Sequence, residues 1–315
     1  MDSHPVKPPR LSTTLLSQPY QFPMSTSTFQ SHHSILESSA RSYPTRPAFR
    51  TPVVNEGTSQ ISEWATITYT QFYQDVQLYA RYWSSILSAD SSVASGSIIG
   101  LWYVPPLVQS SITDFVFDSR LGGIAYTDVL HVYGMTRAGY IPQMFSLRLP
   151  NPIVIFELLQ KTGARALVCE PSFCVDLSGC PVLTYSAIKI REQDVADVAL
   201  PPLRIDYSAS DLVFIFHTSG STSGRPKLVP CNRRWLDNVV TKSKQLAQVR
   251  STQGQDVAVA MYGDIQNCLV PFFNLTIFSI LPIHSGSMCH MGQTLSKRPT
   301  PAPIFAKCVN RRILV

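Results

Sequence analysis

Charged side chains are scarce in this chain. Asp, Glu, Lys and Arg make up 15% of the 315 residues, whereas about a quarter is usual in a soluble domain. The formal net charge of +6 comes from basic residues that are scattered along the chain. A nucleic-acid-binding protein needs basic side chains gathered against the phosphates, so this composition argues against a nucleic-acid partner. The hydrophobic content of 44% is sufficient for a packed core.

Cysteine motifs and a secretory leader are also missing. The seven cysteines include no Cys-x-x-Cys pair, so we interpret them as thiols in a reducing compartment rather than as zinc ligands or a disulfide framework. Residues 1–33 are rich in Ser, Thr, Pro and Gln and contain no apolar segment of the kind that a secretory signal needs. We therefore expect residues 1–33 to be a disordered tail and the protein to be cytoplasmic.

No apolar run reaches the length of about 20 residues that a membrane-spanning helix requires. The most apolar region, from 261 to 285, is interrupted by Pro271 and Pro282. We therefore expect no membrane partner. The alternative is a membrane-associated protein anchored through residues 268–283, which partitioning into detergent micelles would support.

Short apolar runs and amphipathic segments alternate from residue 34 to residue 260. Three of the runs are short and apolar on both faces, as buried strands are; they lie at 98–102, 166–169 and 212–216. Three amphipathic segments follow residues that favour helix N-caps; these caps are Thr70, Asn151 and Asn232. This alternation is typical of an α/β fold in which helices cover a mostly parallel sheet.

A loop rich in glycine and hydroxyl groups directly follows the last of these strands. It reads His-Thr-Ser-Gly-Ser-Thr-Ser-Gly-Arg-Pro-Lys from residue 217 to residue 227. Glycine lets the backbone approach an anion closely, successive amides can form an anion-binding nest, and hydroxyl and ammonium groups donate hydrogen bonds. The loop therefore predicts a phosphate-binding site. Its expected members are Thr218, Ser219, Gly220, Ser221, Thr222, Gly224 and Lys227.

A Walker A loop and a surface linker are two other interpretations of residues 217–227. The segment is not a Walker A loop, because Gly220 and Gly224 enclose three residues rather than four and Lys227 is followed by Leu228. A surface linker is the alternative that composition alone suggests, since clusters of Ser, Thr and Gly are common in linkers.

The same run resembles the signature of the adenylate-forming (AMP-binding) superfamily, whose usual form is Thr-Ser-Gly-Ser/Thr-Thr-Gly-x-Pro-Lys. The chain departs from this form by one extra residue, Ser223, between Thr222 and Gly224. Residues 137–142 are similar to the Ala-Gly-x-x-x-Pro turn of the same family, and the resemblance extends over roughly 34–256. The wording of these segments most resembles fungal enzymes of the nonribosomal-peptide-synthetase-like type.

This resemblance implies a fold and an activity. The fold would be an incomplete amino-terminal large domain of an adenylate-forming enzyme, with a partial adenylation domain at 34–260. Full-length members such as acyl-CoA synthetases use ATP and Mg²⁺ to convert a carboxylic acid into an acyl-adenylate. Many then pass the acyl group to the thiol of coenzyme A or of a phosphopantetheine on a carrier-protein domain. The loop from Thr218 to Lys227 would bind the β- and γ-phosphates, and no catalytic residue or metal ligand is assigned.

Two segments depart from the family pattern, and its downstream motifs have no match. We expect inserts at 103–120 and at 261–285, the second followed by a non-family tail that ends at residue 315. Translated introns would explain both inserts, and surface insertions, which loops tolerate, are the alternative. We therefore expect a truncated ligase, by lineage an acid–thiol or amino-acid-adenylating enzyme, that is inactive alone. The alternative is a non-catalytic nucleotide-binding or interaction remnant.

Overall fold

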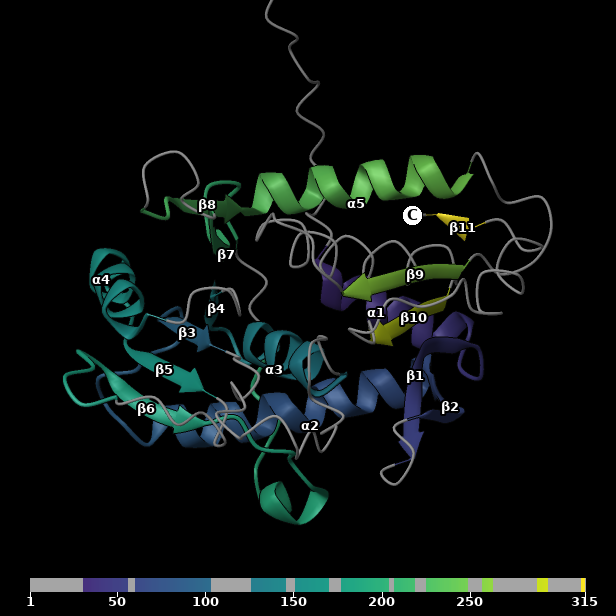
Figure 1. Cartoon of the computed structure of the whole chain (residues 1–315), viewed down its shortest axis with the longest axis horizontal. Helices are drawn as coiled ribbons and strands as arrows, with labels where there is room; N and C mark the ends of the chain where they lie inside the picture. Colours follow the sequence, from purple (N-terminus) through teal and green to yellow (C-terminus); the bar gives the residue numbers. More distant parts are fainter. Residues whose placement is uncertain are drawn as a thin grey trace, which may run out of the picture.

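The structure is a computed structural model that describes residues 31–55, 60–102, 126–145, 151–169, 177–203, 207–218, 225–248, 257–262, 288–293 and 313–314. These residues form a six-stranded and a five-stranded sheet with helices packed around them (Figure 1). The expected α/β fold with a mostly parallel sheet is confirmed. Of the disordered tail expected at 1–33, the structure describes only the last three residues. The insert expected at 103–120 lies wholly outside the described residues.

The six-stranded sheet carries the segment of interest. Its order is β6-β5-β3-β4-β7-β8. The strands are β3 (Ile98–Trp102), β4 (Ile141–Phe145), β5 (Ala166–Cys169), β6 (Leu183–Ser186), β7 (Leu212–His217) and β8 (Leu228–Asn232). Neighbouring strands from β6 to β7 are parallel, and β8 alone runs antiparallel to its neighbour β7. The three strands predicted from the sequence therefore become three of the parallel strands.

The five-stranded sheet has the order β11-β9-β10-β1-β2. Its strands are β1 (Pro47–Asn55), β2 (Gln60–Thr68), β9 (Val257–Tyr262), β10 (Met288–Gln293) and β11 (Ile313–Leu314). β1 and β2 form an antiparallel pair, whereas the other pairings are parallel. The second expected insert, at 261–285, is described only for its first two residues, which end β9.

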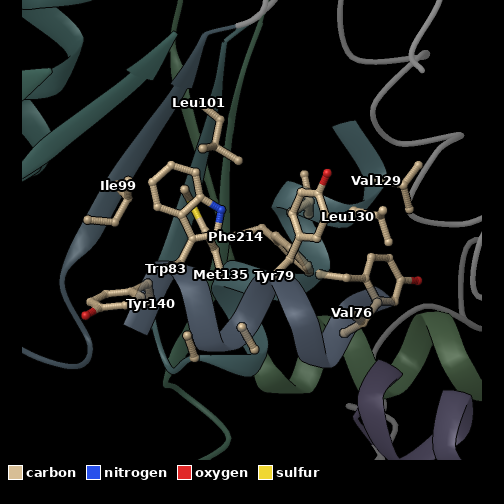
Figure 2. Close-up of a cluster of buried hydrophobic side chains, with 14 of the residues drawn as sticks. Val76, Tyr79, Trp83, Ile99, Leu101, Val129, Leu130, Met135, Tyr140 and Phe214 are labelled. Carbon is tan, nitrogen blue, oxygen red and sulfur yellow. The ribbon is translucent and has the colours of Figure 1, made fainter. Parts of the chain in front are cut away.

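The helices cover both faces of the six-stranded sheet. They are α1 (His32–Ser42), α2 (Tyr69–Ser88), α3 (Tyr126–Arg137), α4 (Pro152–Thr162) and α5 (Arg233–Gln248), with a short 3₁₀ helix at Glu192–Val195. α2 and α3 share one buried cluster with alternate residues of the strands. Figure 2 shows Trp83 of α2, Ile99 of β3 and Leu130 of α3 in this cluster. α4 packs on the opposite face, against Trp102, Phe145 and Leu167.

Helix ends follow the local sequence, with one correction. Asn151 caps α4 by accepting a hydrogen bond from the Ile153 amide, and Asn232 accepts one from the Trp235 amide at 2.9 Å, both as predicted. The predicted cap at Thr70 is wrong. α2 begins at Tyr69, and its N-cap is Thr68, whose hydroxyl accepts from the Gln71 amide. The Tyr69 side chain is completely buried, and this packing accounts for the earlier start.

The centre of α3 packs tightly against α2. A Cβ atom at Gly134 would lie 2.9 Å from the Tyr79 carbonyl carbon and 3.2 Å from the Ala80 amide nitrogen, so only glycine allows this approach. One turn earlier in α3, His131 accepts a hydrogen bond at Nδ1 from Trp83 Nε1, at 3.1 Å. The two helices therefore share a backbone contact and a buried polar contact.

α1 is attached to α3 through two adjacent histidines. His32 and His33 are both buried, and the Nε2 atom of each lies 2.9 Å from the Thr136 hydroxyl. Thr136 has a single proton to donate, so at least one of the two imidazoles must donate to its oxygen. Burial is the main cause that lowers the pKa of both histidines, to about 3 in His32. The pair is therefore neutral in the folded protein.

Replacing Thr136 by valine tests this attachment. Thr136→Val keeps the shape of the side chain but removes the hydroxyl, which leaves two buried imidazole nitrogens without that partner. An unsatisfied buried polar group costs about 1–3 kcal/mol, so with two such groups we expect urea denaturation to show a loss of about 2–6 kcal/mol in the free energy of unfolding. Thr136→Ser keeps the hydroxyl and should lose about 1 kcal/mol for the methyl group. Equal losses in the two variants would contradict the attachment.

Candidate phosphate-binding site

The connection between β7 and β8 begins at the carboxyl edge of the six-stranded sheet. Strands β3, β4, β5 and β7 run in one direction, so their last residues lie along the same edge. These last residues are Trp102, Phe145, Cys169 and His217. β8 returns antiparallel to β7, with Leu228 opposite His217. Ligands of open α/β sheets bind outside this edge, so the connection from Thr218 to Lys227 starts where a ligand-binding loop would.

Two hydrogen bonds close the base of this connection. The Thr218 amide donates to the Lys227 carbonyl at 2.8 Å, and the Lys227 amide donates to Thr218 Oγ1 at 2.9 Å. The two ends of the loop are therefore bonded to each other. The Lys227 side chain is exposed, which leaves its ammonium group accessible to an anion.

The structure brings the first and last predicted site residues together. Thr218 and Lys227 lie nine positions apart in the sequence and are hydrogen-bonded partners. The remaining predicted members are Ser219, Gly220, Ser221, Thr222 and Gly224, and they lie outside the described residues. Their assignment to phosphate binding stays a prediction.

His217 is a residue of this site to which the sequence analysis gave no role. It is the last residue of β7 and is 4% exposed, and its Nδ1 atom lies 3.0 Å from the Thr218 carbonyl oxygen. Its ring stacks on Phe145, the last residue of β4, with 6.0 Å between ring centroids. Burial lowers the pKa of His217, and the bond to Thr218 partly opposes that shift. The signal in the sequence was a titratable aromatic residue at the end of a buried strand.

A second set of polar contacts fixes the segment that follows β8. Arg233 is the first residue of α5, and its amide donates to the Asp211 carbonyl at 2.9 Å. Its guanidinium carbon lies 3.3 Å from the centre of the Tyr207 ring, a cation–π arrangement. These contacts join the start of α5 to the residues just before β7. The first residue of β7 and the last residue of β8, which lie at the ends away from the loop, are therefore held together.

Other ligand classes find little support in the described part of the chain. Within it, no three His, Cys, Asp or Glu side chains are grouped so that they could hold a metal ion. Its cysteines, Cys169, Cys180 and Cys231, are thiols. Among the helices that it includes, none combines the length and the hydropathy needed to cross a bilayer.

The chain is similar in sequence to an AMP-binding enzyme and a nonribosomal peptide synthetase. No protein-family model matches the chain. The chain is 29% identical, over 211 residues, to the AMP-binding domain-containing enzyme iboA of Amanita muscaria. This match covers 65% of this chain and 37% of that enzyme. The chain is 26% identical, over 249 residues, to the nonribosomal peptide synthetase SIDC of Beauveria bassiana, covering 78% of this chain and 4% of that protein. Both relatives are fungal, in agreement with the resemblance.

The fold is shared with solved adenylate-forming enzymes. O-succinylbenzoate coenzyme A synthetase from Bacillus subtilis, solved with ATP and a magnesium ion, superposes with a TM-score of 0.57 at 15% identity. The match covers 88% of this chain and 60% of that one. By comparison, the chain spans about a third of the length of the AMP-binding relative from Amanita muscaria. In sequence and fold it corresponds to the amino-terminal part of these enzymes.

Proposed function

We propose, from the relationship of this chain to the amino-terminal part of adenylate-forming enzymes, that its Thr218–Lys227 loop binds the β- and γ-phosphates of ATP. The observation that carries the proposal is the closed base of that loop, where Thr218 and Lys227 are hydrogen-bonded to each other at the carboxyl edge of a parallel sheet. The chain would supply the phosphate-binding part of a ligase that activates a carboxylic acid with ATP.

The described residues fit a polyphosphate. Thr218 Oγ1 accepts the Lys227 amide, and a hydroxyl that accepts in this way still has its own proton to donate. Lys227 also contributes an exposed positive charge at this end of the loop, and charge-assisted hydrogen bonds to phosphate are about twice as strong as neutral ones. Mg²⁺ keeps several waters and is commonly bound through the nucleotide phosphates, so it would arrive with ATP and would neutralise phosphate charge there.

The reaction needs the carboxylate held in line with the α-phosphorus while pyrophosphate leaves. Hydrogen bonds from the loop and the charge of Lys227 would stabilise the negative charge that develops on the leaving pyrophosphate. The acyl group would pass to coenzyme A or to phosphopantetheine on a carrier-protein domain, in the cytoplasm. Because the chain spans 37% of its AMP-binding relative, we propose that it binds ATP but does not activate an acid alone.

Replacing Lys227 tests the proposal directly. Lys227→Met keeps the aliphatic stem and removes the charge. We expect isothermal titration to show a roughly 10- to 100-fold weaker affinity for Mg-ATP, as the loss of one charged hydrogen bond of about 1.5–3 kcal/mol predicts. Lys161→Met is the matched control, because Lys161 lies in α4, outside the loop, is also exposed and changes the net charge equally. A similar loss in both variants would indicate general attraction rather than a site.

Carboxylate-dependent exchange of pyrophosphate into ATP tests whether the chain activates an acid alone. ATP binding without exchange is expected for this chain and also favours the nucleotide-binding remnant. Robust exchange would show that the chain is a working ligase and would overturn the proposed inactivity. Absence of ATP binding by the unmodified chain would overturn the proposed function itself.

A further inference from the structure

All three polar groups of Thr218 are engaged within the base of the loop. Its amide donates to the Lys227 carbonyl at 2.8 Å, and its Oγ1 accepts from the Lys227 amide at 2.9 Å. Its carbonyl lies 3.0 Å from His217 Nδ1. Lys227 provides the first two bonds and His217 the third. Of these two partners of Thr218, His217 is the one that belongs to a strand, because it is the last residue of β7.

The tautomer of His217 follows from this bond. A carbonyl oxygen can only accept, so Nδ1 must carry the proton and donate it. The imidazole itself has little freedom to turn, because it is 4% exposed and stacks on Phe145 at an interplanar angle of 28°. Burial lowers the pKa of His217, which agrees with a neutral ring that donates from one nitrogen. The donor is thus held in place by packing before any ligand binds.

The Thr218 carbonyl belongs to the peptide group that leads into the loop. That group is planar, so a hydrogen bond that fixes its carbonyl restrains the orientation of the whole peptide unit. An anion-binding nest depends on the directions of its backbone amides. A phenylalanine at position 217 could reproduce the stacking on Phe145 but could not restrain the Thr218 carbonyl.

We propose that His217 is a positioning residue for nucleotide triphosphates: it donates a hydrogen bond from Nδ1 to the Thr218 carbonyl and thereby orients the first peptide group of the loop for phosphate. This inference rests on the proposed function of the loop. It adds a residue that is not among the predicted phosphate-binding residues, which begin at Thr218, and it assigns the role to one nitrogen atom of one side chain.

Three substitutions in the full chain separate the donor from the ring. His217→Asn places an amide nitrogen at the same number of bonds from Cβ as Nδ1, so it can keep the donor. His217→Gln moves its amide nitrogen one atom further, and His217→Phe keeps the ring but has no donor. We expect the asparagine variant to bind Mg-ATP within about threefold of the unmodified chain, and the other two about tenfold more weakly, as the loss of one hydrogen bond predicts.

AMP provides the control ligand, since it lacks the β- and γ-phosphates. Its affinity should be the same in all four proteins if His217 acts through the loop, whereas a general loss of structure would lower it too. Melting temperatures report on folding, and the phenylalanine variant retains the aromatic packing should the glutamine variant fold poorly. Amide hydrogen exchange at Thr218 and Lys227 should become faster in the glutamine and phenylalanine variants without any ligand.

The outcomes distinguish this inference from the function on which it rests. If the unmodified chain binds no ATP, the proposed function fails and this inference fails with it. If the unmodified chain binds ATP and the glutamine and phenylalanine variants bind it equally well, only the positioning role is overturned. Weak ATP binding by the asparagine variant as well would show that the imidazole ring, rather than its Nδ1 donor, is what matters.

Discussion

Replacing Gly134 by alanine is expected to lower the free energy of unfolding by about 3 kcal/mol or more. The new Cβ atom would lie 2.9 Å from the Tyr79 carbonyl carbon and 3.2 Å from the Ala80 amide nitrogen. These are backbone atoms in the middle of α2, so no change of rotamer can relieve the overlap. Overpacking of a buried site costs about 1–3 kcal/mol and sometimes more, and here the two helices must move apart.

Helix propensity acts in the opposite direction at Gly134. Alanine is favoured over glycine by about 1 kcal/mol in a helix interior, which would make the substitution stabilising if α3 were exposed. The steric term is larger, because Tyr79 and Ala80 are both buried and separation of α2 from α3 would open the core. The sign of the effect therefore reports whether the two helices are in contact at this point.

Gly100 of β3 offers a matched control for Gly134. A Cβ atom there would approach the ends of side chains only, at 2.7 Å from Leu159 Cδ2 and 3.0 Å from Leu167 Cδ1. Because these side chains can shift, Gly100→Ala should cost about 1 kcal/mol. Urea denaturation followed by tryptophan fluorescence measures both variants. A Gly134→Ala variant as stable as the unmodified chain would contradict the packing of α2 against α3.

The second large effect is a loss of stability in mild acid. His32 and His131 are buried, and burial lowers the pKa of each to about 3; the nearby Arg233 also lowers that of His32. In the unfolded chain both have pKa values near 6.5. The folded state therefore binds fewer protons below pH 6.5, and the stability of the protein falls from pH 6.5 down to about pH 3.

The magnitude follows from the two pKa values. At pH 4.5 each histidine would lower the free energy of unfolding by about 2.7 kcal/mol, so the two together lower it by about 5 kcal/mol. That is comparable with the whole stability of a marginal domain, about 5–15 kcal/mol. Burial raises the pKa of Asp75, which works in the opposite sense at low pH but involves one carboxyl group. We expect the urea midpoint to fall steeply between pH 6.5 and pH 4.5.

His131 allows the acid effect to be assigned to one residue. Its Nδ1 accepts a hydrogen bond from Trp83 Nε1, and an indole can only donate, so protonation of Nδ1 must break that bond. His131→Asn can keep an acceptor near that position but does not titrate. Its stability should decline less steeply, by about 1.4 kcal/mol per pH unit between pH 6.5 and pH 3. An unchanged slope would show that His131 does not contribute.

The elements that sequence reasoning predicted are those with simple local signals. β3, β5 and β7 are short apolar runs, and α4 begins with Asn151 and Pro152 and ends at Gly163, whose φ of 68° is left-handed. Such end signals act within a few residues and need no knowledge of the fold. The misplaced cap of α2 shows their limit, because two threonines separated by one residue carry the same signal.

α3 and β4 were not predicted because their sequences lack the usual signals of a helix and of a strand. The eight consecutive residues from Val129 to Thr136 are all buried, so α3 has no polar face to give a helical period. β4 contains Pro142 and Gln143, which are unusual inside a central strand. Gln143 is tolerated because its amide donates to the Leu158 carbonyl at 3.3 Å and accepts from the Thr162 hydroxyl at 2.6 Å. Such partners cannot be read from the sequence.

The candidate site divides in the same way. The composition of residues 217–227 predicts a phosphate-binding loop, and that assignment stays a prediction; the structure gives Thr218 and Lys227 as bonded neighbours. The restraint from His217 could not be predicted, because it depends on the register that brings β4 beside β7, where Gln143 pairs with Ile215. That register places the Phe145 ring against His217.

The mutual bonding of Thr218 and Lys227 also bears on how such loops diverge. The eight residues between them carry the one-residue difference from the usual superfamily form, Ser223. Since both ends are anchored to each other, an insertion or deletion there need not alter the pairing of β7 with β8. Natural variation in the length of this loop can then change the ligand while the sheet stays intact. The segment between Thr218 and Lys227 is therefore suited to evolutionary change and to loop grafting.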